Sequence, residues 1–327
     1  MSESSKTNFF LTGATGYIGG TVLMRFLAHP HASSFRFTVL VRDPKKAEKL
    51  SSIPGVHAVV GSHSDAHLVE KLASEADIVI ATADCDDLGA AKATLSGLQK
   101  RHTLGCTSIF INTVVRQLGV LSDTAAGMYA GTTIYDDSDP DQIDTLAPTQ
   151  MHRDVDLAIT NADAEGYVKS YIILPSTIYG LATGTLVDMS VQNPHSQQVP
   201  SLINAALDRG QAGIVGEGKN LWPNVEINEL ADLYVKLYDA IDDDADGTGH
   251  GRNGFYFGAS DEHSLYDVGK AINAALGSSY LGSNSRCRAT RSLSIGWKPV
   301  KTTSDLLASV LPETEALIKK KAAAAAQ

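Results

Sequence analysis

Residues 8–20 read Asn8-Phe9-Phe10-Leu11-Thr12-Gly13-Ala14-Thr15-Gly16-Tyr17-Ile18-Gly19-Gly20, an apolar run followed by regularly spaced glycines. We interpret this stretch as a strand, a glycine turn and the start of a helix that continues through residues 21–27. Gly13 permits a tight turn after the strand, Gly16 lets a diphosphate approach the backbone, and Gly19 lets the helix pack close to the sheet. The first N–H groups of the helix and its positive dipole end then face the phosphates.

The context of this glycine pattern is what makes it informative. The pattern follows a predicted strand and opens a predicted helix near the N-terminus, which is the setting that a dinucleotide site requires. A strand–helix turn without a ligand is the alternative interpretation. If a dinucleotide binds, we expect contacts from the residues of the turn, namely Thr12, Gly13, Thr15, Gly16, Tyr17, Ile18 and Gly19.

The composition is that of a globular enzyme with a large core. The chain has 327 residues, of which 43% are hydrophobic and 20% are charged. Its formal net charge of −10 argues against a nucleic-acid partner or an anionic membrane, because both require basic patches. Residues 1–7 are polar, and no apolar run approaches the roughly 20 residues that span a bilayer.

The cysteines point to a reducing compartment. Cys85, Cys106 and Cys287 are odd in number and widely spaced, which favours neither a disulfide framework nor a metal knuckle. We therefore expect a cytoplasmic protein without a metal site, whose partner is a small molecule and not a membrane or a nucleic acid.

Strands and helices alternate through the first half of the chain. Apolar runs at 35–43, 56–61, 77–83 and 108–114 read as strands, and 88–102 reads as a helix. Such alternation predicts an α/β fold with a doubly wound parallel sheet and right-handed crossovers. We expect this nucleotide-binding domain to cover residues 1–180. Residues 181–327 are then mainly a smaller α/β substrate-binding part, with segments that return to the first domain.

The end of the second strand bears on the choice of cofactor. In a dinucleotide site this position meets the adenosine ribose, where an arginine accepts a 2′-phosphate and a carboxylate repels it. Arg42, followed by Lys45 and Lys46, favours NADP(H), whereas Asp43 is evidence against it. A solvated helix start is the alternative for these basic residues.

Two later strands also end in candidate cofactor residues. Asp65 follows the third strand, where its carboxylate would accept from the adenine amino group or cap a helix. Thr82 and Ala83 end the fourth strand and are expected beside the cofactor ribose.

Several motifs together resemble the extended short-chain dehydrogenase/reductase family. They are the glycine turn at 12–19, Arg42 after the second strand, and Pro175-Ser176-Thr177-Ile178-Tyr179-Gly180 after a strand at 169–174. The family includes nucleotide-sugar epimerases, dehydratases and carbonyl reductases, and the chain resembles most its uncharacterised fungal members of the NAD-dependent epimerase/dehydratase type. The resemblance implies a Rossmann fold that binds NADP(H). It also implies that Pro175, Thr177 and Ile178 line the nicotinamide face.

The catalytic positions depart from that family. The family places a Ser or Thr after its fifth strand, and a Tyr-x-x-x-Lys pair on the next long helix, where i,i+4 spacing puts both residues on one face. Here Thr113 fits the hydroxyl position, but the helix at 151–159 carries His152 and Asp156 where the pair is expected. His152 with Asp156 is either an acid–base pair or a structural contact.

Other tyrosines offer a second source of a proton. Tyr129 and Tyr135 lie in the long segment 118–148, which has the length of a lid over a site. Loop packing is the alternative for both tyrosines. The string Tyr266-Asp267-Val268-Gly269-Lys270 has the right spacing, but it lies late in the chain on a predicted surface helix.

The sequence therefore retains the cofactor site more clearly than the proton-transfer residues. We expect an NADPH-dependent oxidoreductase that transfers hydride to a small carbonyl, imine or activated alkene, with His152, Tyr129, Thr113 and Asp156 as catalytic candidates. A non-redox isomerase or cyclase that retains NADP(H), or a catalytically silent NADP(H) sensor, is the alternative. Asn193, His195 and Trp222 either line the substrate pocket or serve as a cap, a surface residue and a packing residue. We expect a monomer or a homodimer.

Overall fold

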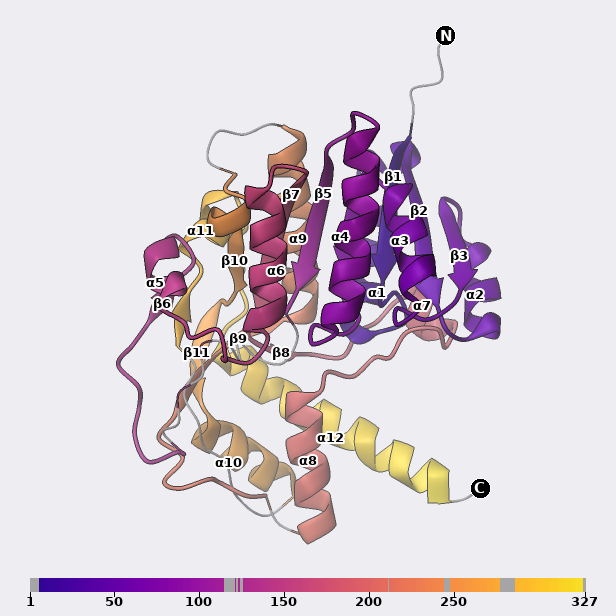
Figure 1. Ribbon diagram of the computed structural model, residues 1–327. Helices are drawn as coiled ribbons and strands as arrows, with labels where there is room; N and C mark the ends of the chain where they lie inside the picture. The colour runs from indigo at the N-terminus through magenta and orange to yellow at the C-terminus, as the bar shows by residue number, and fades with distance from the viewer. Residues whose placement is uncertain are drawn as a thin grey trace.

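A parallel sheet of seven strands forms the centre of the computed structural model, which describes residues 6–114, 121, 123, 126–210, 212–243, 248–276 and 286–325 (Figure 1). The strand order is β10-β7-β5-β4-β1-β2-β3. In chain order these strands are β1 (Thr7–Thr12), β2 (Phe35–Val41), β3 (Val56–Val60), β4 (Ile78–Ala81), β5 (Ser108–Thr113), β7 (Val168–Pro175) and β10 (Phe255–Gly258).

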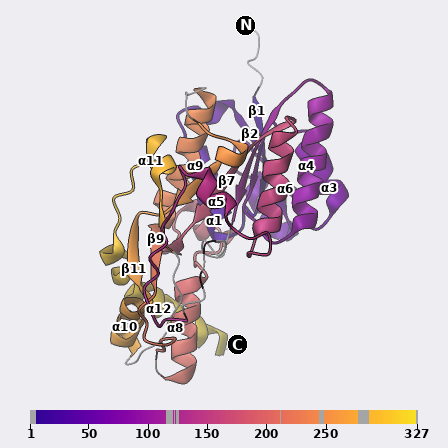
Figure 2. The same cartoon turned by 60° about the vertical axis from the view of Figure 1, so that its left-hand side comes forward.

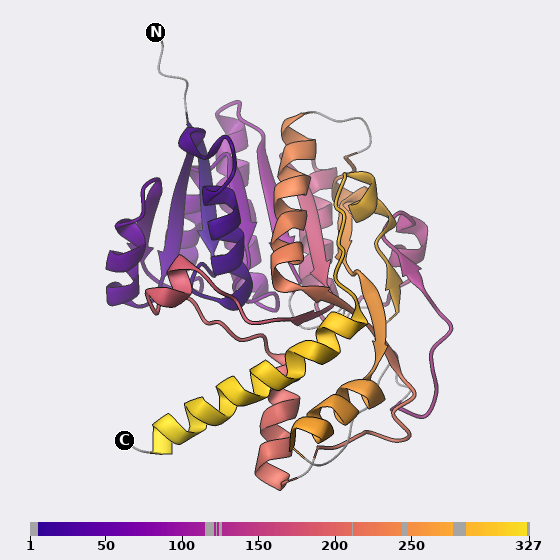
Figure 3. The same cartoon turned by 180° about the vertical axis from the view of Figure 1, so that it is seen from behind.

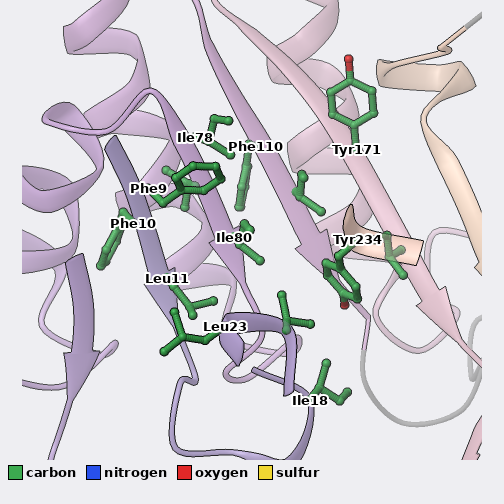
Figure 4. Packing of buried hydrophobic residues seen from close by; sticks show 14 of the residues in the cluster. Phe9, Phe10, Leu11, Ile18, Leu23, Ile78, Ile80, Phe110, Tyr171 and Tyr234 are labelled. Carbon is green, nitrogen blue, oxygen red and sulfur yellow. The ribbon is translucent and has the colours of Figure 1, made fainter. Parts of the chain in front are cut away.

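The middle strands are buried on both faces, which explains their unbroken apolar runs. β1 lies between β2 and β4, with Phe9 in register with Phe37 on one side and with Ile78 on the other. Figure 4 shows Phe9 among the buried side chains of neighbouring strands. The rings of Phe9 and Phe37 stack with centroids 4.6 Å apart, and Tyr238 packs against Phe9 at 5.7 Å.

Helices cover both faces of this sheet, as a doubly wound fold requires. Figure 1 shows α3 (Ala66–Ser74), α4 (Leu88–Thr103) and α6 (Arg153–Ala164) on one face. Figure 3 shows α1 (Tyr17–Leu27) and α9 (Ile227–Asp242) side by side on the other. The fold class predicted from the sequence is confirmed, although α6 begins two residues later and runs further than predicted.

A smaller body lies beyond the carboxyl edge of the sheet (Figure 2). Its three-stranded sheet has the order β11-β9-β8, with β8 (Thr177–Tyr179), β9 (Leu221–Glu226) and β11 (Asp261–Ser264). Its helices are α8 (Gln198–Arg209), α10 (Leu265–Leu276) and α12 (Thr303–Ala325). Trp222, Ile203, Val268 and Leu306 belong to a second hydrophobic cluster here, so Trp222 is a packing residue.

The two bodies exchange segments of chain. α9 and β10 come after residue 180, yet both belong to the large Rossmann-like part. The remaining elements are α2 (Pro44–Ser51), α5 (Pro140–Asp144), α7 (Thr185–Asp188), α11 (Thr290–Ser294), β6 (Tyr135–Asp136), β12 (Cys287–Arg288), η1 (Ala32–Ser34) and η3 (Gly251–Asn253). Among the described helices, none combines the length and the apolar character needed to cross a bilayer.

Candidate active site

The turn between β1 and α1 has the backbone that its glycines predict. Gly13 has a φ of +82°, and its carbonyl accepts a hydrogen bond of 2.8 Å from the Gly16 N–H. A Cβ on Gly19 would lie 2.3 Å from Thr82 Oγ1 and 2.4 Å from the Gly13 carbonyl oxygen. The start of α1 therefore approaches the end of β4 as closely as only glycine allows. No side chain caps α1, so the first turn of this helix keeps N–H groups for an anion.

A cavity of about 550 Å³ opens beside this turn, at the carboxyl ends of β1, β2 and β4. Open α/β sheets bind ligands at this edge. The cavity brings together seven of the cofactor residues predicted from the sequence, namely Thr12, Gly13, Thr15, Gly16, Arg42, Thr82 and Ala83. The glycine cradle, the uncapped helix start and the basic end of the cavity fit a dinucleotide.

The basic end of the cavity consists of Arg42 and Lys46. Lys46 is also bonded to the protein, because its Nζ donates to the Val191 carbonyl at 2.8 Å. Asp43 caps α2, and its Oδ1 accepts from the Lys45 N–H at 2.8 Å and from the Lys46 N–H at 3.4 Å. The carboxylate that counted against NADP(H) is therefore engaged by its own helix.

Two further residues near the adenosine end differ from the expectation. Asp65 caps α3 by accepting from the Leu68 N–H at 3.1 Å, so it follows the helix-cap alternative. It is exposed and is not among the residues that line the cavity. His63 does line the cavity and was missed in the sequence. Its position just after the glycine that ends the third strand was the available signal.

A second cavity of about 200 Å³ adjoins the first, and the two share Gly16, Thr82, Ala83 and Gln197. It contains two further residues of the glycine motif, Tyr17 and Ile18. Its other walls are Ser176, Ile178, Asn193, His195, Ser196 and Gln198. The structure brings Ile178, Asn193 and His195 to one cavity.

Two residues close to Ile178 in the sequence are buried away from both cavities. Pro175 and Thr177 are buried at the strand ends on either side of Ser176, and neither is among the residues that line the two cavities. Ser176 Oγ donates to the Gly258 carbonyl at 2.7 Å, which ties this turn to β10. The expectation that Pro175 and Thr177 line the nicotinamide face stays a prediction.

His152 lies directly behind the wall of the first cavity. It caps the start of α6 with a φ of +69°, a left-handed conformation that is uncommon for residues other than glycine. Its ring is fully buried, and Nδ1 contacts the carboxylate of Asp86, whose side chain is 45% exposed. Cys85 Sγ lies 3.5 Å from the same nitrogen. Asp86 and Cys85 both line the cavity, whereas His152 is not among the lining residues.

The His152 imidazole and the Asp86 carboxylate, which are in contact, are groups that can exchange a proton. The sulfur, nitrogen and oxygen of Cys85, His152 and Asp86 lie within 4.8 Å of one another. Cys, His and Asp side chains are also metal-ligand types, but Nδ1 and the Asp86 carboxylate contact each other directly, as in a hydrogen-bonded pair.

Asp156 is not the partner of His152, which corrects the prediction from i,i+4 spacing. Both of its carboxylate oxygens are buried without a hydrogen-bond partner among the described residues. Burial raises the pKa of this carboxyl to about 7, against a lowering influence from Arg153. The prediction failed because a residue in the left-handed cap lies outside the regular helix and directs its side chain elsewhere.

The other proton-donor candidates lie away from the cavities or are already bonded. Thr113 Oγ1 lies 2.6 Å from the Tyr234 hydroxyl and is buried. Burial raises the pKa of Tyr234 well above its usual value. Tyr129 is 53% exposed and does not line either cavity. Tyr266 and Lys270 lie on α10 in the smaller body, where the lysine packs over the tyrosine ring.

Comparison with known proteins agrees with the geometry of the cofactor cavity. A family model described as NAD(P)H-binding matches residues 13–131. The protein named Oxidase ucsJ from an Acremonium species is 32% identical over 282 residues, which cover 81% of this chain and 77% of that protein.

Solved structures share the whole fold at low sequence identity. UDP-glucose 4-epimerase from Thermotoga maritima, solved with UDP-glucose, is 15% identical with a TM-score of 0.67, covering 95% of this chain and 100% of that one. A dTDP-glucose 4,6-dehydratase from Bacillus anthracis, solved with NAD, is 15% identical with a TM-score of 0.64, covering 95% and 97%. At this identity the likeness shows the fold alone.

Proposed function

Because this chain belongs to the extended short-chain dehydrogenase/reductase family of NAD(P)-binding proteins, we propose that it is an NADPH-dependent reductase of a small carbonyl, imine or activated alkene. The observation that carries the proposal is the cavity formed by the glycine turn, with Arg42 at one end and the Asp86–His152 pair at its wall. NADPH bound there supplies the hydride.

The preference for NADPH rests on the charges around the ribose end. Arg42 and Lys46 both line the cavity, and a guanidinium is well suited to pair with a phosphate. Asp43 does not oppose them, since its carboxylate is held by the N–H groups of α2. Charge-assisted contacts of this kind are stronger than neutral hydrogen bonds.

The proton that completes the reduction comes from the Asp86–His152 pair. His152 is too deeply buried to meet a substrate, whereas Asp86 is partly exposed at the cavity. In this proposal the Nδ1 proton of a protonated His152 moves to the Asp86 carboxylate, and Asp86 donates it to the substrate anion that hydride transfer leaves. A neutral imidazole and a carboxylate remain, and a proton from solvent that enters through the exposed Asp86 restores the imidazolium. Histidine is the side chain that enzymes use most often for such proton transfer. The pair thus takes the place of the absent Tyr-x-x-x-Lys motif.

The decisive experiment is a titration of the purified protein with NADPH and with NADH. It is followed by carbonyl, imine and enone substrates, with oxidation measured at the nicotinamide absorbance. We expect tighter binding of NADPH and its oxidation by at least one class of substrate. Selective binding without oxidation by any substrate would favour the sensor or the non-redox enzyme, for which the missing Tyr–Lys pair is the supporting observation. Equal affinity for NADPH and NADH would contradict the proposal that Arg42 recognises the 2′-phosphate.

A further inference from the structure

The second cavity has no permanently charged side chain among its described lining residues. Tyr17, Ile18 and Ile178 supply apolar surface, while the polar groups are amides, hydroxyls and one imidazole. Recognition of a diphosphate depends on Arg, Lys or clustered N–H donors. The N–H groups at the start of α1 also border this cavity, but they are the ones expected to meet the cofactor diphosphate, and the side chains of the lining add no cation. The lining therefore favours an uncharged ligand over a nucleotide sugar.

His195 is held in this wall from two sides. Asn193 clamps its backbone, donating from Nδ2 to the His195 carbonyl at 2.9 Å and accepting from the His195 N–H at 3.2 Å. Nδ1 of the ring lies 2.5 Å from Oε1 of Glu313, which reaches it from α12. The His195 side chain is 13% exposed and that of Glu313 is 4% exposed. These contacts fix the position of the ring in the wall of the cavity.

The bond to Glu313 also decides which ring nitrogen carries hydrogen. An ionised carboxylate can only accept, so Nδ1 is the donor. In the neutral ring Nε2 then carries a lone pair and serves as an acceptor. A ligand that meets His195 in this form must bring a hydroxyl or an N–H group.

We propose that His195, oriented by Glu313, selects an uncharged substrate that carries a hydroxyl group, such as a hydroxylated carbonyl compound. His195 is the substrate-binding residue, and Glu313 is a positioning residue that acts through it. The proposal rests on the proposed reductase function only in assigning a carbonyl as the reacting group.

The test uses 4-hydroxybenzaldehyde and its methyl ether, which have the same carbonyl and differ in the donor. Binding to the NADP⁺-loaded full-length protein is measured by ligand-observed NMR, with UDP-glucose as a third probe. We expect the hydroxyl compound to bind about tenfold more tightly than the ether, the effect of one hydrogen bond. Tighter binding of the ether or of UDP-glucose, or no binding of either aldehyde, would overturn the proposal.

Variants separate recognition from a general loss of structure. His195→Phe should abolish the preference for the hydroxyl compound, and His195→Gln, which keeps an acceptor, should restore part of it. Glu313→Leu should reduce the preference, whereas Glu313→Gln still accepts from Nδ1 and should keep most of it. Glu315→Gln changes an exposed acid on the same helix and serves as the control. An unchanged preference in His195→Phe would refute the assignment.

Turnover distinguishes this proposal from the proposed function. Reduction of each aldehyde by NADPH is measured in parallel, and His195→Phe should raise KM for the hydroxyl compound about tenfold with little change in kcat. A protein that prefers the hydroxyl compound but oxidises no NADPH retains the His195 assignment and loses the reductase. An equal fall of kcat for both aldehydes, with KM unchanged, would contradict the binding role.

Discussion

Two helices near the first cavity follow a left-handed residue, which lies in the turn before the N-cap of α1 and at the N-cap itself in α6. The turn into α1 uses Gly13 at a φ of +82°, whereas α6 begins at His152 with a φ of +69°. Glycine adopts such angles without a steric cost, while another residue there costs about 1–3 kcal/mol and persists only where its surroundings hold it. Contacts from Asp86 and Cys85, more than 60 residues away, surround the His152 ring.

The difference shows which parts of a site can be read locally. A glycine turn is determined by its own residues, so its geometry follows from the pattern. The His152 turn depends on chain segments that meet only in the folded protein. Strain at a polar residue beside a cavity is also the kind of outlier that marks a functional site.

The largest expected effect is on kcat, and it comes from changing the left-handed residue before α6. His152→Ala should lower kcat by roughly 10²–10⁴-fold, because the Asp86 carboxylate loses its proton source. NADPH binding should change little, since His152 does not line the cofactor cavity. Steady-state kinetics with a cofactor titration make the measurement, and His57→Ala, at an exposed position on β3, is the control. Turnover close to that of the unaltered protein would exclude His152 from proton transfer.

The first turn of α6 should also give the protein a pH-dependent stability. Burial raises the pKa of Asp156 to about 7 in the folded protein, above its value in the unfolded chain. The folded state therefore binds the proton more tightly, and the unfolding free energy falls as pH rises from about 4 to about 7. The loss is at most about 4 kcal/mol.

Asp156→Asn should remove this component of the pH dependence. Relative to the unaltered protein, the variant should gain more unfolding free energy at pH 8, where the carboxylate is ionised, than at pH 4. Denaturant unfolding at a series of pH values makes the comparison, and Glu165→Gln, at the exposed C-terminal end of the same helix, is the control. Parallel pH profiles for Asp156→Asn and the unaltered protein would show that this carboxyl does not titrate in the window.

On the α1 side, Gly19→Ala tests whether the close approach of the helix is required. The added Cβ would meet the Gly13 carbonyl oxygen at 2.4 Å, so α1 must shift away from β4. We expect a loss of about 1–3 kcal/mol in unfolding free energy and weaker NADPH binding. Gly105→Ala has a φ of +87° with no atom within 4 Å of the new Cβ, so it reports backbone strain alone. Unchanged NADPH affinity in Gly19→Ala would show that the turn tolerates a wider spacing.

The smallest effect concerns the choice between the two nicotinamide cofactors. Arg42→Ala should weaken NADPH binding by about 1–3 kcal/mol, the value of a hydrogen bond to a charged group, and should leave NADH binding nearly unchanged. Fluorescence titration with each cofactor measures the difference, and Arg36→Ala, at an exposed position on β2, is the control. An equal loss for NADH would mean that Arg42 supports the cavity without reading the 2′-phosphate.

The cofactor half of the site was largely predictable from these residues. Seven predicted residues meet in one cavity because parallel strands all end at the same edge of the sheet. Asp65 was ambiguous, since a carboxylate that follows a strand suits a helix cap as well as an adenine contact. Trp222 was also ambiguous, because a large aromatic ring is found both in ligand pockets and in hydrophobic cores.

The residues that we propose for proton transfer could not be predicted in the same way. Spacing along α6 suggested Asp156 as the partner of His152, and the folded protein supplies Asp86 instead. No short-range pattern connects residues 66 positions apart. His195 was recognised as a pocket candidate, but its partner Glu313 lies 118 residues later on the last helix.

The sequence by itself determined the features that depend on neighbouring residues. These are the glycine turn, the buried apolar strands and the basic residue after β2. Their geometry follows from steric freedom and from period-two or unbroken apolar patterns within a few residues. Only the tertiary structure decided which carboxylate contacts the ring of each histidine. Side-chain hydrogen bonds need partners within about 3 Å, and packing of distant segments sets that distance.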